Sequence, residues 1–236
     1  TGSEATRGAV ISDTETHQKA IISGATLGPT AACLDATLLT GLPPHITAAT
    51  GMDALTHAIE AYISVWDTAD AKAKAKSAVK LVFKHLPTAY SDGSNIASRG
   101  AMSYAAYLAG QAINLVNVGN VHAIAHQLGG QYGIPHGLAN SMVLPHVLDM
   151  SLESSRTRLT ELAEVIGKNT AEEFVAAVRE LNATLDIPET VSELKAEDIA
   201  AIQGRAVDEG AGYSVPHFME SADCKFILEK LLPEAA

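Results

Sequence analysis

The sequence predicts a mainly α protein, with an all-helical domain over residues 45–236 preceded by a short β-containing segment over residues 1–44. From Thr47 onward, Ala-rich segments carry apolar residues at intervals of three and four, a pattern typical of packed amphipathic helices. The chain has 236 residues, of which 47% are hydrophobic and 18% charged, so it can bury a substantial core. A globular, helix-rich fold is therefore expected.

Each element is predicted from local patterns and turn residues. Short β-like pieces are expected at residues 9–12 and 31–34, bounded by Gly, Pro, Asp and Thr. Gly or Pro separates many of the later segments, as in Ser91-Asp92-Gly93-Ser94 and Gly133-Ile134-Pro135. Mixed charges at Lys195-Ala196-Glu197-Asp198 indicate a solvated helix face. The predicted helices cover residues 47–64, 68–90, 95–116, 119–131, 137–153, 155–167, 170–184, 196–208 and 220–232.

Composition excludes several classes of protein. The formal net charge of -11 argues against nucleic-acid binding, which draws its affinity from clustered Lys and Arg. No apolar run approaches the roughly 20 residues that span a bilayer, and no signal peptide is evident, so neither a membrane nor export is expected. A cytoplasmic protein is predicted. Cys33 and Cys224 fit a reducing compartment and are expected to be packing residues.

Two short segments carry residues at metal-ligand spacing. Asp53 and His57 are four residues apart, one turn on a single helix face, so a carboxylate and an imidazole can chelate one cation. The same spacing also suits a hydrogen-bonded pair on a helix surface, and the pair alone does not decide between the two. His122 and His126 repeat the spacing, and His136 follows. Each could be a core or capping histidine, but their concentration favours a metal site.

The residue types limit the chemistry of such a site. Ala123 follows His122, so the general-base Glu of an HExxH metalloprotease is absent and peptide hydrolysis is not expected. Asp and His ligands suit Fe(II), Zn(II), Mn(II) or Co(II). No GxGxxG turn for a dinucleotide is present. The glycine-rich stretch at residues 129–133 is better explained as a helix end followed by a turn.

Together these segments resemble the iron-dependent, or group III, alcohol dehydrogenase family, which includes lactaldehyde reductase and butanol dehydrogenases. The resemblance runs nearly end to end, and its most specific segments are residues 1–6, Leu42-Pro43-Pro44, residues 49–62, residues 135–140 and Leu144-Pro145-His146. In that family an N-terminal α/β nucleotide-binding domain precedes an all-helical metal-binding domain. The resemblance thus implies that residues 1–44 are a remnant of the first domain and residues 45–236 the second. The start at Thr1, without Met, is expected to reflect a truncated or proteolysed product.

The resemblance also implies a set of site residues and partners. A divalent metal, Fe(II) in preference to Zn(II), would be held by Asp53, His57, His122 and His136. His126 would be the catalytic residue and move a proton. Contacts with NAD or NADP would come from Thr1, Val10, Lys19 and Leu38. The expected substrates are a small alcohol and its aldehyde or ketone. A homo-oligomer is expected for a different reason, because loss of the partner domain would expose an apolar cleft wall.

Two other interpretations remain at this point. A related glycerol dehydrogenase-like enzyme would hold zinc with one Asp and two His, leaving His122 or its neighbours in other roles. Alternatively, the isolated chain is a non-catalytic helical fragment that binds metal or dimerises, which the missing glycine-rich turn favours. The chain alone is expected to have little or no NAD(P)-dependent activity.

Overall fold

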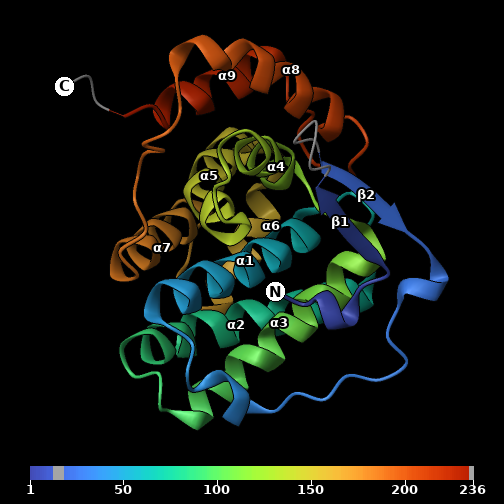
Figure 1. Ribbon diagram of the computed structural model, residues 1–236, viewed down its shortest axis with the longest axis vertical. Helices are drawn as coiled ribbons and strands as arrows, with labels where there is room; N and C mark the ends of the chain where they lie inside the picture. The colour runs from blue at the N-terminus through green and yellow to red at the C-terminus, as the bar shows by residue number, and fades with distance from the viewer. Residues whose placement is uncertain (13–18, 234–236) are drawn as a thin grey trace.

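The computed structural model, in which residues 1–12 and 19–233 are described, confirms the mainly α fold class. Figure 1 shows α1, α2 and α3 lying together, α4 and α5 beside them, and α8 and α9 across one end. The helices are α1 (Pro44–Ile63), α2 (Ala69–Ser91), α3 (Ile96–Val116), α4 (Asn120–Tyr132), α5 (His136–Met150), α6 (Leu152–Val165), α7 (Ala171–Thr184), α8 (Ile199–Gly210) and α9 (Ser221–Lys230). Every predicted helix is present, and no predicted end differs from the observed one by more than three residues.

Local sequence explains where several helices begin and end. The Thr68 and Asn95 side chains accept backbone N–H bonds at the starts of α2 and α3, and Thr170 and Glu173 form a reciprocal capping box at α7. Helix α4 ends at Gly133, whose left-handed φ of 69° suits a residue without a side chain. The glycine-rich stretch at 129–133 therefore is the end of a helix, as predicted.

Helix α1 is the centre of the domain. It contacts α2, α3 and α5, and nearly all its residues from Thr47 to Ile63 are buried. A helix buried on every side has no solvent face on which to place polar residues, so Asp53, His57 and Glu60 must find partners inside the protein.

The N-terminal segment contains one small sheet and two departures from prediction. Strand β1 (Gly8–Ser12), predicted at 9–12, pairs antiparallel with β2 (Lys19–Ser23), which was not predicted. The prediction of a strand at residues 31–34 is wrong, because that segment has no regular secondary structure and pairs with neither described strand. It runs outside the helices between η2 (Ala25–Leu27) and η3 (Ala36–Leu39) (Figure 1).

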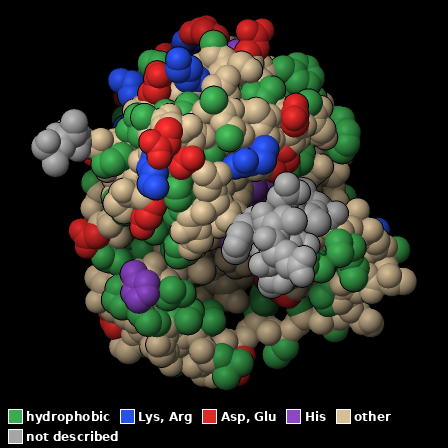
Figure 2. Space-filling view, turned by 45° about the horizontal axis from the view of Figure 1, so that its top comes forward, with side chains coloured by type: hydrophobic (Ala, Val, Ile, Leu, Met, Phe, Trp, Pro, Cys, Tyr) green, Lys and Arg blue, Asp and Glu red, His purple; other side chains and the backbone are tan. Residues whose placement is uncertain are grey.

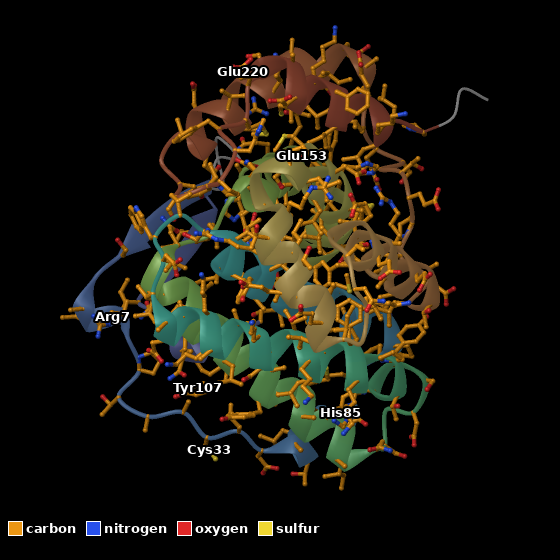
Figure 3. All side chains as sticks on the ribbon, turned by 180° about the vertical axis from the view of Figure 1, so that it is seen from behind. Arg7, Cys33, His85, Tyr107, Glu153 and Glu220 are labelled. Atoms are coloured by element: carbon orange, nitrogen blue, oxygen red, sulfur yellow. The ribbon has the colours of Figure 1, made fainter. Side chains whose placement is uncertain are left out.

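The cysteines and the C-terminal charges can now be placed. Cys224 is buried in the core as expected, but Cys33 is exposed on the outlying segment, so its prediction as a packing residue is wrong (Figure 3). Residues 195–197 are exposed, as predicted for a solvated face. On the face shown in Figure 2, charged side chains of both signs gather over the C-terminal helices. Across residues 1–12 and 19–233, none of the helices has both the length and the apolar character needed to cross a bilayer.

Candidate metal centre

The structure brings Asp53, His57, His122 and His136 to one point. Each offers one ligand atom, and these atoms all lie within 4.8 Å of one another. The Asp53 Oδ1 atom is 3.9 Å from His57 Nε2 and 3.4 Å from His136 Nε2. The His57 and His122 rings stack at 4.7 Å between centroids, with 14° between their planes. Side chains from α1, α4 and the first residue of α5 thus converge on a site that no single helix could build.

A glycine lets α5 begin this close to α1. A Cβ atom at Gly137 would lie 2.3 Å from the Ala49 carbonyl oxygen and 3.1 Å from Asp53 Cβ. Backbone atoms of a buried helix cannot move aside as a flexible side chain can. The absence of a side chain at residue 137 therefore brings its neighbour His136 within reach of Asp53.

Two polar atoms of the cluster remain without a partner, although both are buried. These atoms are Asp53 Oδ2 and His57 Nδ1. Asp53 is fully buried and His57 is only 7% exposed, so the interpretation of this pair as a surface hydrogen bond is wrong. A buried carboxylate oxygen without a hydrogen bond costs free energy that a bound cation would recover. A divalent metal ion fits this site, because the ligands are a carboxylate and imidazoles, they are largely buried, and two of their polar atoms have no hydrogen-bond partner.

Glu60 orients the His122 ring through Nδ1, the ring nitrogen that does not face the cluster. The His122 Nδ1 atom lies 2.6 Å from Glu60 Oε2, and the same carboxylate accepts hydrogen bonds from the backbone N–H groups of Gly119 and Val121. His122 Nε2 faces the amide nitrogen of Asn140, which only donates, so Nε2 carries the lone pair and the ring donates to Glu60 through Nδ1. Such a carboxylate behind a ligating histidine is a common feature of metal sites.

Burial and neighbouring charges set the protonation of these groups. Burial raises the pKa of Asp53, but attraction to the imidazoles of His57 and His136 and a hydrogen bond from Asn140 outweigh it, so the net pKa is lowered. Burial raises the pKa of Glu60 to about 7 despite its backbone hydrogen bonds. Burial also lowers the pKa of His122 well below its ordinary value, as do nearby histidines. His122 is therefore a neutral imidazole at neutral pH, the form that binds metals.

Asn140, one turn after His136 on α5, lies within the cluster. Its amide nitrogen donates to Asp53 Oδ1 at 2.7 Å and is 3.2 Å from the Nε2 atoms of both His122 and His136. The amide is thus a hydrogen-bond donor placed among the same acceptor atoms that would surround a cation.

His126 lies beside the four residues rather than among them. Its ring is 5.2 Å from that of His136 and 5.7 Å from that of His122. The His126 Nδ1 atom is 2.6 Å from Glu209 Oε1 of α8. His126 is therefore next to the cluster, and its role as the catalytic residue stays a prediction.

The residues predicted to contact the nucleotide fall into two places. Thr1 and Leu38 both line a groove of about 440 Å³ between the N-terminal segment, α1 and α3, and Leu38 is 80% exposed. Val10 lies on β1 and is half-exposed, and Lys19 begins β2, opposite Ser12. Thr1 and Leu38 therefore line one groove, whereas Val10 and Lys19 lie on the two-stranded ribbon formed by β1 and β2. The nucleotide role of all four residues stays a prediction.

Sequence reasoning missed three residues that organise the site: Glu60, Asn140 and Glu209. A signal existed for the first two. Glu60 is three residues after His57, and Asn140 four residues after His136, so each shares a helix face with a candidate ligand. Glu209 is 83 residues from His126, and no local pattern indicates that pairing.

Fold and site together define a helical domain that gathers one carboxylate and three imidazoles around a single point, as metal-dependent enzymes do. The chain belongs to the Fe-containing alcohol dehydrogenase family, since the C-terminal part of the family's profile matches residues 47–232. The family named from the sequence segments is therefore confirmed.

Curated relatives and solved structures agree with this family. The chain is 40% identical to a 1,3-propanediol dehydrogenase of Klebsiella pneumoniae over 226 residues, covering 92% of this chain and 58% of the relative. It is 37% identical to an NAD-dependent methanol dehydrogenase of Bacillus methanolicus, covering 98% of this chain and 64% of that protein. A crystal structure of a 1,3-propanediol oxidoreductase superposes with a TM-score of 0.94 at 38% identity, covering 98% of this chain and 63% of the other. The chain thus spans about three fifths of each of these proteins.

The contact between Glu60 and His122 leads to a prediction. Glu60→Gln is expected to weaken divalent-metal binding by about 10- to 100-fold. The two oxygens of Glu60 contact three N–H groups, those of Gly119, Val121 and His122, whereas a glutamine has one accepting oxygen and one donating nitrogen. Competition with a chromophoric chelator measures this affinity. Glu229→Gln is the matched control, since Glu229 is half-exposed on α9 and pairs with Lys225, far along the chain from the cluster. Equal affinities for the two variants would show that Glu60 does not support the site.

Proposed function

We propose that this chain is the metal-binding part of an NAD(P)-dependent oxidoreductase that interconverts a primary or other small alcohol and its aldehyde or ketone. One observation carries the proposal: Asp53, His57, His122 and His136 meet in a buried cluster whose Asp53 Oδ2 and His57 Nδ1 atoms lack partners. The relatives named for alcohols of one and three carbons support the substrate class.

Fe(II) is the proposed metal, with Zn(II) as the alternative. The ligand set of one carboxylate and three imidazoles accepts either ion, and the family description favours iron. In a glycerol dehydrogenase-like site, one Asp and two His hold the metal, so one of these three histidines would not be a ligand. All four ligand atoms lie within the same 4.8 Å, which favours the four-residue set.

The chain's own residues then have distinct roles in the proposed reaction. A divalent cation supplies a Lewis acid that makes an alcohol hydroxyl more acidic. Glu60 keeps the His122 ring fixed through Nδ1, so that its Nε2 faces the site. His126 is proposed to accept a proton at Nε2, because its Nδ1 is already bonded to Glu209. The apolar core around α1 excludes water from the buried side of the cluster.

The nicotinamide cofactor is proposed to reach this site from the N-terminal side. The groove that Thr1 and Leu38 line, and the ribbon that carries Val10 and Lys19, are the proposed contacts with it. We further propose that residues 1–44 belong with a nucleotide-binding domain and residues 45–236 form the metal-binding domain. The family profile, which matches from residue 47, supports this division. NAD is favoured over NADP because one relative is described as NAD-dependent.

A cobalt-substituted preparation tests this function on the chain itself. Co(II) reports changes in its coordination through visible absorption, so addition of trifluoroethanol, a small alcohol, is expected to shift the spectrum. The His45→Ala variant, altered at an exposed histidine outside the cluster, should respond as the unmodified chain does. A spectrum that does not change as trifluoroethanol is added would contradict alcohol binding at this metal.

A second prediction concerns the 236 residues alone. They are expected to show little or no NAD(P)-dependent alcohol oxidation, because they span 58% of the 1,3-propanediol dehydrogenase and 63% of the matching solved structure. Exposed apolar residues of the ribbon, Val10, Ile11 and Ile22, also favour self-association. Absorbance at the nicotinamide band and sedimentation velocity measure the two properties. Ordinary turnover by a preparation of verified 24.6 kDa mass would contradict the first.

A further inference from the structure

We propose that Glu209 is a positioning residue that holds His126 in one tautomer, with the proton on Nδ1 and an unprotonated Nε2. The use of that Nε2 as a proton acceptor rests on the proposed function, but the tautomer is a property of this chain alone. Nothing in the spacing of the two residues along the sequence predicts their contact, which joins α4 to α8.

The contact itself is short and largely protected. His126 Nδ1 lies 2.6 Å from Glu209 Oε1, and the His126 side chain is only 4% exposed, compared with 21% for Glu209. A carboxylate oxygen accepts and cannot donate, so the proton of this hydrogen bond belongs to Nδ1. In a neutral imidazole the other nitrogen, Nε2, is then an acceptor. The direction of one hydrogen bond therefore fixes the chemistry of the whole ring.

Glu209 is itself held by two neighbours, one of which is oriented by a third residue. The Tyr213 hydroxyl donates to Oε1 at 2.6 Å, and the Gln127 amide donates to Oε2 at 2.7 Å. Arg205 Nε in turn donates to the Gln127 Oε1 atom at 3.1 Å, which sets the orientation of that amide. Both carboxylate oxygens of Glu209 thus accept hydrogen bonds from side chains in set positions. The Glu209 side chain cannot rotate away without breaking several hydrogen bonds at once.

The ring that Glu209 holds lies against the metal cluster. His126 and His136 stack with 23° between their planes, and His122 meets His126 edge-on at 74°. These contacts place the His126 ring directly against two of the proposed metal ligands, so its tautomer bears on the chemistry of the cluster. A fixed tautomer beside the cluster therefore has a direct chemical consequence for the proposed proton transfer.

Nuclear magnetic resonance on the ¹⁵N-labelled, metal-free chain at alkaline pH tests the proposal. Long-range proton–nitrogen correlations distinguish the two tautomers of neutral histidine, and the His126 signals are assigned by their loss in His126→Ala. The unmodified chain is expected to show a protonated Nδ1 and an unprotonated Nε2. Glu209→Ala should lose this preference, and Glu209→Gln, whose Oε1 can still accept from Nδ1, should restore it.

Two control variants separate positioning from a general effect on packing. Tyr213→Phe and Arg205→Ala each alter the surroundings of Glu209 and leave its carboxylate in place, so both should keep the Nδ1–H tautomer. A protonated Nε2 in the unmodified chain would overturn the proposal, even if Glu209→Ala failed to fold. An unchanged Nδ1–H tautomer in folded Glu209→Ala would also overturn it.

The same experiment distinguishes this inference from the proposed function. The tautomer of His126 is read without metal, alcohol or nicotinamide. If the spectrum of the cobalt-loaded chain does not change with trifluoroethanol, the proposed alcohol chemistry is contradicted, while the role of Glu209 in fixing the His126 tautomer is unaffected. If the cobalt spectrum does change but His126 carries its proton on Nε2, the role of Glu209 is contradicted and the proposed alcohol chemistry is supported.

Discussion

Replacing Asp53 with Asn is expected to weaken divalent-metal binding by more than about 100-fold, beyond the range seen for loss of an outer hydrogen-bonding partner. Asp53 supplies the only carboxylate of the four-residue group and lies within 4 Å of two of its histidines. A neutral amide has the same shape but lacks the charge that attracts a cation. Chelator competition on the purified variant measures the change.

The same substitution should leave the metal-free fold intact. Asn has the shape of Asp, and its Oδ1 atom can still accept the hydrogen bond from the Asn140 amide, so the packing around residue 53 is kept. The Asp53→Asn chain should therefore still unfold in one cooperative transition, as the metal-free parent does. Asp70→Asn, altered at an exposed aspartate of α2, is the matched control and should retain parental affinity. Comparable affinities for both variants would remove Asp53 from the ligand set.

Gly137→Ala is expected to lower the free energy of unfolding by about 3 kcal/mol, at the upper end of overpacking costs. The new methyl group would lie 2.3 Å from the Ala49 carbonyl oxygen and 2.8 Å from the Ala49 carbonyl carbon. Alanine favours a helix over glycine by about 1 kcal/mol, but overlap with backbone atoms outweighs that gain. For a chain of this size the melting temperature should fall by roughly 6–12 °C.

The Gly137→Ala variant should also bind metal more weakly, since α5 cannot separate from α1 without moving His136 away from Asp53. Gly204→Ala is the matched control. Gly204 lies inside α8, and a Cβ atom there would meet nothing within 4 Å, so this variant should gain up to about 1 kcal/mol. A Gly137→Ala chain with parental melting temperature and metal affinity would contradict the close packing of α1 against α5.

The helices could be predicted from sequence because their signals are local. Apolar spacing, N-caps such as Thr68 and Thr170, and glycine after α4 act within a few residues of each helix end. The strands were harder to predict because pairing depends on distant residues. The apolar residues 31–34 resemble a strand but find no partner, while Lys19–Ser23 pairs with β1 through a register that its own composition does not indicate.

The candidate site was partly predictable for the same reason. Four-residue spacing on α1 and α4 indicated that Asp53 with His57, and His122 with His126, would share helix faces. That α1, α4 and α5 converge was implied only by the family resemblance. Glu209 could not be found at all, because its contact with His126 depends on how α8 packs across α4.

The most direct test of the central claim is the metal content of the purified chain after anaerobic reconstitution with Fe(II) or Zn(II), measured by plasma mass spectrometry. The arrangement of Asp53, His57, His122 and His136 predicts close to one equivalent per chain, retained in His45→Ala and lost in Asp53→Asn. A chain that holds no stoichiometric metal, or that holds it equally well after Asp53→Asn, would contradict the assignment of this cluster as a metal site.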